Sequence, residues 1–192
     1  MDAGTAPVAL KAGDTIRITM INGSLKGMKK RFDRELEGLV MRTKEKAENV
    51  EYYNLKALTI NQCAGCFGCW VKTPGLCVFD DDMEQILKSI VHSDLLVFAS
   101  PLVMGFVSSL IKRCMDRMIP LIHPYFDFVN GEMHHMKRYE SYPQLGIIYQ
   151  KSEDDTEEDV SICRAIFDRF VINMHSELRF FCQLKDAEGE LI

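Results

Sequence analysis

Apolar residues along this chain follow two different spacings, which predicts strands and helices in turn. Residues 15–22 read as a strand, alternating at first and then continuously apolar, and residues 94–100 form an uninterrupted apolar run. Such a run is typical of the centre of a parallel sheet, where both faces of a strand are covered. Three further strands are expected over residues 52–60, 145–150 and 177–184.

Residues at helical spacing separate these strands. Four helices are expected, and two of them start at recognisable caps. Asp80 or Asp81 precedes the second helix, and Thr156 with Asp159 resembles a capping box at the fourth. The apolar faces consist, in chain order, of Phe32, Leu36, Leu39 and Val40; Met83, Ile86, Leu87, Ile90 and Val91; Leu110, Ile111, Cys114, Met115, Met118 and Ile119; and Ile162, Cys163, Ile166, Phe167, Phe170 and Val171.

Strands that alternate with helices predict an α/β fold with a parallel sheet and helices on both faces. The 192 residues contain no repeat and no linker that would mark a second domain, so we expect one domain, with residues 1–14 flexible or peripheral. In such sheets ligands bind beyond the carboxyl ends of the strands. The loops after the first three strands should therefore meet at one edge.

Composition narrows the classes of function. The formal net charge of −5 argues against a general nucleic-acid binder, which needs a basic face. Residues 1–14 contain no apolar run of signal-peptide length, so a cytoplasmic protein is expected. An uncharged stretch over residues 95–111 is interrupted by Pro101 and Gly105, which favours a buried strand and loop over a membrane span. We expect neither nucleic acid nor a membrane as partner.

The first of the three loops runs over residues 21–27 and leads from a strand into a helix. Free backbone N–H groups and the helix dipole would face outward there and form an anion site, to which the Ser24 hydroxyl and nearby lysines contribute. The alternative is an ordinary turn into a helix with a solvated basic face. The acidic run over residues 153–159 is interpreted as the solvated start of a helix.

The third loop, over residues 100–112, combines a proline, a glycine and soft apolar side chains at the carboxyl end of a strand. Such a loop could form a flat wall against an aromatic ring. The alternative is a core strand that runs into a helix capped by Ser108 or Ser109.

The second loop contains four of the seven cysteines, with the spacing Cys63-x2-Cys66-x2-Cys69-x7-Cys77. The two short spacings supply three thiol ligands from one curl of the chain, and a turn at residues 74–75 can bring back Cys77 as the fourth. A reducible dithiol, buried thiols or a structural zinc site are the alternatives. The other three cysteines are expected to be small core residues: Cys114, Cys163 and Cys182.

Residues 120–142 read as a long connection rich in aromatic residues and histidines. We interpret it as the lining of a substrate entrance or as a subunit interface, with a metal site as the alternative. The residues concerned are His123, Tyr125, His134, His135, Tyr139 and Tyr142.

Together the three loops carry a resemblance to a known family. Gly23-Ser24 follows the first strand, Ser100-Pro101 and Gly105 follow the third, and the helices contain Lys112, Asp116-Arg117 and Asp81-Asp82-Met83. With the cysteine loop, these motifs resemble the NADPH-dependent FMN reductases of the flavodoxin-like fold, especially the iron–sulfur flavoproteins among them. The resemblance covers residues 16–119 well and the remainder only by the order of elements.

The resemblance implies a doubly wound, three-layer α/β/α fold. Its five-stranded parallel sheet has the order 2-1-3-4-5, and the last helix is short or absent in this chain. It further implies FMN, with the phosphate at Gly23, Ser24 and Lys26. A 4Fe–4S cluster on Cys63, Cys66, Cys69 and Cys77 would lie near the flavin edge. The isoalloxazine ring would meet the backbone of Pro101, Leu102, Val103, Met104 and Gly105.

This chain departs from the family's usual pattern in both flavin loops. The first loop usually continues with a proline, an arginine and a serine or threonine that contacts phosphate, where this chain has Leu25, Lys26 and residues 28–31. The third loop usually has an aromatic residue in place of Val103.

The implied function is an FMN-dependent oxidoreductase. A nicotinamide nucleotide would donate hydride, and a small molecule or a protein would accept the electrons. Homo-oligomers, dimers or tetramers, are expected, and no general acid or base is assigned, because the sequence shows no convincing pair. The alternatives are a non-catalytic electron-transfer flavoprotein or subunit, and a flavin-free redox or zinc-binding module.

Overall fold

The computed structural model describes residues 16–27, 30–47, 49–129 and 131–191. At its centre lies a parallel sheet of five strands in the spatial order β2-β1-β3-β7-β8. Counted along the chain this is the predicted order 2-1-3-4-5. The strands are β1 (Arg17–Asn22), β2 (Asn49–Asn54), β3 (Leu95–Val103), β7 (Gln144–Gln150) and β8 (Leu178–Gln183).

The central strands are buried on both faces, as their continuous apolar sequences predict. In β3, Leu96 and Phe98 pack into one hydrophobic cluster, whereas Leu95, Val97 and Ala99 pack into a second one. Because successive side chains of a strand point to opposite faces, these two clusters are the two cores of a three-layer structure.

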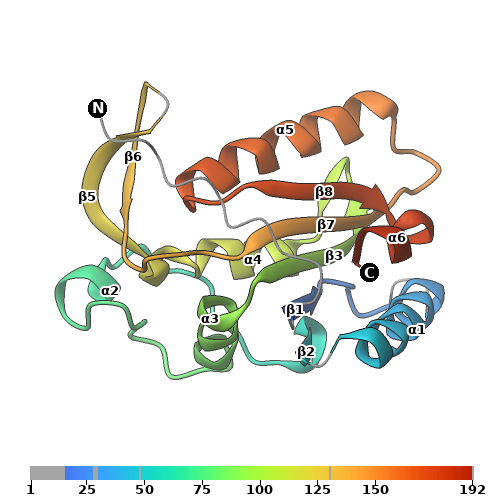
Figure 1. Ribbon diagram of the computed structural model, residues 1–192, viewed down its shortest axis with the longest axis horizontal. Coiled ribbons are helices and arrows are strands. Elements are labelled where there is room, and N and C mark those ends of the chain that lie inside the picture. Colours follow the sequence, from blue (N-terminus) through green and yellow to red (C-terminus); the bar gives the residue numbers. More distant parts are fainter. Residues whose placement is uncertain (1–15, 28–29, 48, 130, 192) are drawn as a thin grey trace.

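Helices cover both faces of the sheet (Figure 1). The core that contains Phe98 is completed by α3 (Met83–His92), α4 (Ser109–Asp116) and α5 (Glu157–Asn173). The other core is completed by α1 (Lys30–Lys46) and by the four-residue helix α6 (Glu188–Leu191), in accordance with the predicted short last helix. The fold is therefore flavodoxin-like, as expected.

Local capping signals were informative for two helices. Thr156 accepts a hydrogen bond from Asp159 N and Asp159 accepts one from Thr156 N, so the predicted capping box of α5 is present. Ser108 caps α4 by accepting a hydrogen bond from Ile111 N. The predicted cap of α3 was wrong by one residue: its N-cap residue is Asp82, although Asp81 Oδ1 accepts a hydrogen bond from Met83 N at 3.1 Å.

The second strand begins and ends earlier than predicted: β2 is Asn49–Asn54, whereas residues 52–60 were expected. β2 ends at Asn54, opposite Asn22 at the end of β1, and a short 3₁₀ turn, Leu55–Ala57, follows. β2 is the edge strand and pairs with β1 alone, so its ladder ends where β1 ends.

Residues 120–142 are more ordered than the expected connection. After a 3₁₀ turn (Ile119–Leu121), β5 (Ile122–Val129) and β6 (Glu132–Lys137) form an antiparallel hairpin at one end of the molecule, beside helix α2 (Gly68–Val71) (Figure 1). The dipeptide Asn-Gly at residues 130–131 is a strong hairpin signal that sequence reasoning overlooked. Two further short elements are β4 (Phe106–Val107) and a 3₁₀ turn, Leu184–Asp186.

Within the described ranges, no helix combines the length and the apolar character that a membrane crossing requires.

Gly146 is a sharp test of this packing. It lies in β7 opposite Phe180 of β8, and a Cβ atom at Gly146 would lie 2.2 Å from Phe180 Cζ. We therefore expect Gly146→Ala to lower the free energy of unfolding by about 1–3 kcal/mol. The matched control is Gly189→Ala in α6, where nothing lies within 4 Å of the added methyl group. Equal urea denaturation midpoints for the two variants would contradict the described packing.

Candidate functional site

The first and third loops lie at the same edge of the sheet, as predicted. Gly23 N donates a hydrogen bond to Ala99 O at 2.8 Å, so the first loop continues the pairing of β1 with β3. A Cβ atom at Gly23 would lie 2.2 Å from Ile111 Cγ1 and 2.9 Å from Ser108 Oγ. Glycine is thus required where the first loop packs against the beginning of α4, directly after the third loop.

A buried polar network lies beneath the first loop. Asn22 and Ser24 are both buried. Ser24 N donates to Asn22 Oδ1 at 2.8 Å, and Ser24 Oγ donates to Asp33 Oδ1 at 2.5 Å. Asn22 Nδ2 donates to Asp33 Oδ1 and to Tyr52 Oη, both at 2.9 Å. Both donors of Ser24 are therefore used within the chain.

Lys56 contributes a positive charge to this network. Its Nζ donates to Ser24 Oγ at 3.1 Å and to Asp33 Oδ2 at 2.5 Å. Burial alone would raise the pKa of Asp33, but the hydrogen bonds from Lys56, Ser24 and Asn22 and the Lys56 charge hold it below its usual value. Sequence reasoning singled out neither Asp33 nor Lys56. The remaining predicted phosphate residue, Lys26, is exposed in a turn that ends at Gly27 (φ +86°).

The third loop is a two-residue hairpin turn. β3 runs to Val103 and turns at Met104 (φ 53°) and Gly105 (φ 76°). It then returns as β4, with Val103 opposite Phe106. Left-handed backbone at both central residues is the type I′ geometry, which matches the twist of the flanking strands. Met104 is 98% exposed at its tip.

The five residues predicted to meet a flavin ring thus differ in accessibility. Pro101 and Leu102 are buried, Val103 and Gly105 are half-buried, and only Met104 is fully exposed. The accessible part of this loop is therefore its tip, residues 103–105.

The acidic residues before α5 support this turn. Gly105 N donates to Asp155 Oδ1 at 3.2 Å, and a Cβ atom at Gly105 would lie 2.8 Å from Asp159 Oδ1. Asp155 is buried and also accepts a hydrogen bond from Ser152 N at 2.6 Å. The interpretation of the acidic run as merely solvated was therefore wrong for Asp155, which joins the loop after β7 to the loop after β3.

The four cysteines of the second loop lie together on a tightly curled segment. Gly65, Phe67 and Gly75 all have positive φ, and Cys63 and Cys66 are exposed. Trp70 Nε1 donates to Ile122 O at 2.9 Å, and the Trp70 ring lies 5.0 Å from that of His135. Trp70 therefore anchors the cysteine loop on the β5–β6 hairpin.

The second loop starts at the edge that carries the other two loops, where Lys56 contacts Ser24, but its cysteine-bearing part lies elsewhere. The expected closeness of a cluster to the predicted flavin edge is therefore wrong within one chain. Arg113 Nη1 donates to Ile60 O at 3.1 Å and Arg117 Nη1 to Asn61 O at 2.7 Å, which draws residues 60–61 along α4. Figure 1 shows α2 and the hairpin at the opposite end of the molecule from the loop that precedes α5.

A buried ion pair closes the base of the cysteine loop. Arg117 Nη1 and Nη2 donate to Asp81 Oδ2 at 2.8 Å and to Asp81 Oδ1 at 3.0 Å, and the two side chains are 1% and 2% exposed. Asp81 Oδ2 also accepts from Asn61 N at 2.9 Å and from Asn61 Nδ2 at 3.0 Å. Arg117 further lies over the Phe79 ring, 5.3 Å from its centre. We call Arg117, Asp81 and Asn61 the clasp.

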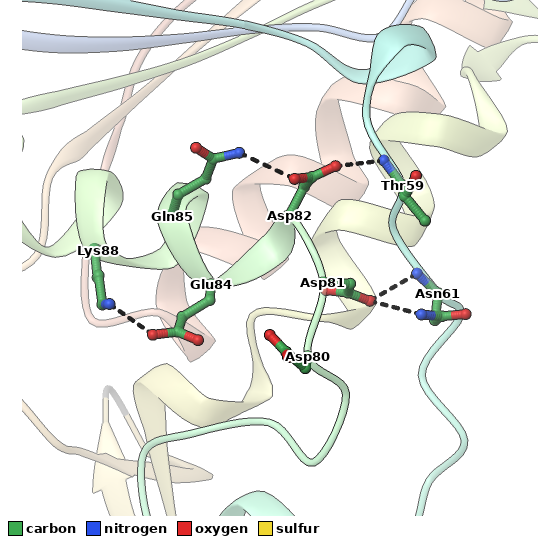
Figure 2. A pocket seen from close by; sticks show the side chains of 8 residues that line it. All are labelled: Thr59, Asn61, Asp80, Asp81, Asp82, Glu84, Gln85 and Lys88. Carbon is green, nitrogen blue, oxygen red and sulfur yellow. Dashed lines mark hydrogen bonds and ion pairs between the residues drawn. The ribbon is translucent and has the colours of Figure 1, made fainter.

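A second pairing reinforces the clasp. Thr59 N donates to Asp82 Oδ2 at 2.6 Å and Asp82 N donates to Thr59 O at 3.1 Å, so the chain before and after the loop is joined twice (Figure 2). Burial alone would raise the pKa of Asp81, but Arg117 and the donors of Asn61 and Met83 hold it far below its usual value. The carboxylate therefore remains charged at neutral pH.

The hollow beside the clasp has a volume of about 590 Å³ and polar walls. Its charges are largely paired within the chain: Glu84 accepts a hydrogen bond from Lys88 at 2.6 Å, and Asp82 is held by Thr59 (Figure 2). This hollow is thus formed by the closure of the loop.

The other three cysteines of the loop affect the pKa of the Cys69 thiol. The pKa of the Cys69 thiol is raised by burial and then by the nearby Cys77, Cys63 and Cys66, because neighbouring thiolates repel. Iron–sulfur clusters and structural zinc sites both use cysteine thiolates as ligands, so four thiols on one short loop match either. In the described part of the chain, no three His, Cys, Asp or Glu side chains form a ready-made metal site.

The other cysteines and the histidines have structural surroundings. Cys114 and Cys163 are buried in the core, as predicted, whereas Cys182 is half-buried. Burial raises the pKa values of Cys114 and Cys182 to about 12. In the hairpin, His134 pairs with Glu132 at 3.1 Å and His135 stacks on Phe126.

Comparisons with known proteins agree with this geometry. The family model described as NADPH-dependent FMN reductase matches residues 16–137. An iron-sulfur flavoprotein of Methanocaldococcus jannaschii is 36% identical over 77 residues, which are 40% of this chain and 39% of that protein. One from Archaeoglobus fulgidus is 36% identical over 74 residues, 38% of this chain and 33% of that protein. The matches thus span well under half of these curated relatives.

Two solved structures illustrate the shared fold. A flavone reductase superimposes with a TM-score of 0.61 at 15% identity, over 92% of this chain and 60% of that chain. An FMN-dependent NADH-azoreductase from Bacillus anthracis, in complex with FMN, superimposes with a TM-score of 0.60 at 16% identity, over 91% and 95% of the two chains. At these identities the likeness concerns the fold alone.

The clasp predicts a large effect of one substitution. Arg117→Met leaves the Asp81 carboxylate buried without its partner, so the free energy of unfolding should fall by about 3–5 kcal/mol. Proteolytic cleavage within residues 61–81 should become faster. The control is Arg42→Met, which removes an exposed ion pair with Glu188 and should cost at most about 1 kcal/mol. Similar losses in both variants would contradict the clasp.

The Arg117→Met variant also tests how the stability of the chain depends on pH. The pKa of Asp81 is lower in the folded chain than the value of about 3.9 expected unfolded. The ion pair therefore stabilises the wild-type chain fully above about pH 4, and this contribution is lost as the pH falls further. Arg117→Met should remove or reverse this acid dependence in denaturant titrations.

Proposed function

The chain belongs to the NADPH-dependent FMN reductase family, and from this we propose that it is an FMN-dependent oxidoreductase that takes hydride from NADPH or NADH. The observation that carries the proposal is the shared edge of the first and third loops, joined by the Gly23–Ala99 hydrogen bond and by Gly23 packing against α4. Both loops open at the carboxyl end of the sheet, where ligands bind in open α/β folds. The family match over residues 16–137 supports FMN as the ligand.

Bound FMN would supply the chemistry, accepting a hydride and releasing one or two electrons to an acceptor. The chain's own residues would bind and orient it. We propose Gly23, Ser24 and Lys26 at the phosphate and the segment Pro101, Leu102, Val103, Met104 and Gly105 at the ring. Because the Ser24 N–H and O–H are used by Asn22 and Asp33, Ser24 shapes this loop instead of donating to the phosphate.

The ring would meet the tip of the third loop. Left-handed backbone at Met104 and Gly105 forms a tight turn, which Asp155 holds by a hydrogen bond and against which Asp159 lies closely. A turn fixed in this way provides a rigid wall for a planar ligand. Pro101 and Leu102 belong to the core and would contribute backbone atoms at most.

We propose that Cys63, Cys66, Cys69 and Cys77 bind a 4Fe–4S cluster. Their spacing and the names of the two curated relatives support this assignment. The clasp holds both ends of the loop, so the thiols remain close together. Such a cluster would exchange single electrons.

We further propose a homo-oligomer, a dimer or tetramer. The cysteine loop and the flavin edge lie at opposite ends of one chain, so direct electron exchange between them would require the flavin edge of a second copy. The hairpin beside the cysteine loop exposes Tyr125, Phe126 and Phe128, an apolar surface that a second copy could cover. Light scattering measures this directly, and a monomer would contradict the proposal.

The flavin proposal is tested with protein purified without oxygen. It should contain FMN or bind added FMN, and the flavin absorbance should bleach when NADPH or NADH is added. Flavin that a protein donor reduces but no nicotinamide nucleotide reduces would indicate an electron carrier instead. A protein that binds no FMN would overturn the proposal.

The cluster proposal is tested by elemental analysis. Anaerobic protein should contain about four iron and four sulfide per chain. Cys77→Ser should lower both contents severalfold, whereas Cys182→Ser, outside the loop, should leave them unchanged. Zinc in place of iron would indicate the structural zinc site instead. Protein with neither metal would indicate free or redox-active thiols.

A further inference from the structure

Lys56 lies beside the first loop because of the register of the sheet. β1 and β2 pair in parallel, with Asn22 opposite Asn54 at their ends. Ser24 and Lys56 each lie two residues beyond these strand ends, and Lys56 Nζ lies 3.1 Å from Ser24 Oγ. The Lys56 side chain is 26% exposed, so it is held by the network and still partly accessible.

Two side-chain phosphate donors that the family uses in this loop are absent from this sequence, and Ser24 already donates within the chain. The arginine and the second hydroxyl residue that the family has after Gly23-Ser24 are absent here. Ser24 donates its N–H to Asn22 and its O–H to Asp33, and its oxygen accepts a hydrogen bond from Lys56. A phosphate beside Ser24 can therefore accept a hydrogen bond from Lys56 Nζ, whereas the Ser24 hydroxyl proton is already donated to Asp33.

Counting only partners among the described residues, Lys56 has a donor to spare. An ammonium group carries three N–H donors, and Ser24 and Asp33 accept two of them. Asp33 fixes the position of Lys56 through an ion pair, and Asn22 and Ser24 stabilise the Asp33 carboxylate by donating hydrogen bonds to it. The ammonium group is thus oriented before any ligand arrives, which reduces the entropy lost on binding.

We propose that Lys56 binds the terminal phosphate of FMN in this chain, with Ser24 and Asp33 as the residues that position its ammonium group. This inference rests on the proposed FMN function and goes beyond it, because it places the phosphate charge partner outside the first loop, at the end of β2. It also makes Lys56 the residue that distinguishes FMN from riboflavin, which has no phosphate.

The test compares two flavins on the apoprotein by fluorescence titration. Lys56→Gln removes a charge-assisted hydrogen bond, so FMN should bind about 10- to 100-fold more weakly. Riboflavin affinity should change less than about threefold, since riboflavin lacks the group that Lys56 contacts. The matched control is Lys88→Gln, a lysine of α3 that is paired with Glu84, and it should change neither affinity.

A second measurement avoids any effect of the substitution on folding. In the wild-type chain, reductive methylation of Lys56, followed by mass spectrometry, should be slowed by FMN but not by riboflavin. Lys88 should react at the same rate with either flavin. Equal modification of Lys56 with both flavins would overturn the inference.

The outcomes separate this inference from the function on which it rests. Unchanged FMN binding by Lys56→Gln, or equal losses for FMN and riboflavin, would overturn the role of Lys56 and leave the flavin function standing. A wild-type chain that binds neither flavin would overturn both.

Discussion

Arg117 is a charged side chain that is almost entirely removed from solvent, and it is tolerated there because Asp81 lies against it with two hydrogen bonds. Removing two charges from water is costly, so such a pair depends on further hydrogen bonds to its remaining donors and acceptors. Here Asn61 supplies partners to Asp81 Oδ2 and Arg117 Nη1 from the other end of the cysteine loop, whereas Arg117 Nε has no hydrogen-bond partner among the described residues. These contacts, at the C-terminal end of α4, join the two ends of the loop that carries the four clustered cysteines.

The contacts of Arg117 and of Arg113 separate the cysteine loop from the edge where the first and third loops meet. Parallel strands bring the first and third loops together at the carboxyl edge, where the register of β1 with β2 and β3 fixes the neighbours of Gly23 and Ser24. The arginines of α4 draw the second loop away from that edge toward the β5–β6 hairpin, where Trp70 holds it. Sheet topology thus explains why the first and third loops share one edge, and a few long-range side-chain contacts explain the position of the cysteine loop.

Much of the fold was predictable because its signals are local. The apolar run of β3, the capping box of α5 and the alternation of strands with helices depend on residues near one another in sequence. The end of β2 and the path of the cysteine loop were not predictable, because a partner strand decides the first and distant arginines decide the second. Lys56 and Asp33 were missed for the same reason: they become neighbours of Ser24 only through strand register and the packing of α1.

The turn at the tip of the third loop has a consequence for the variation of this protein. Its backbone is fixed by Gly105 and by the aspartates behind it, whereas the Met104 side chain is surrounded by solvent. Asparagine and aspartate, which tolerate left-handed backbone well, would fit at residue 104 without disturbing the core. Natural drift or laboratory evolution can therefore change the polarity of this surface while the scaffold beneath it stays the same.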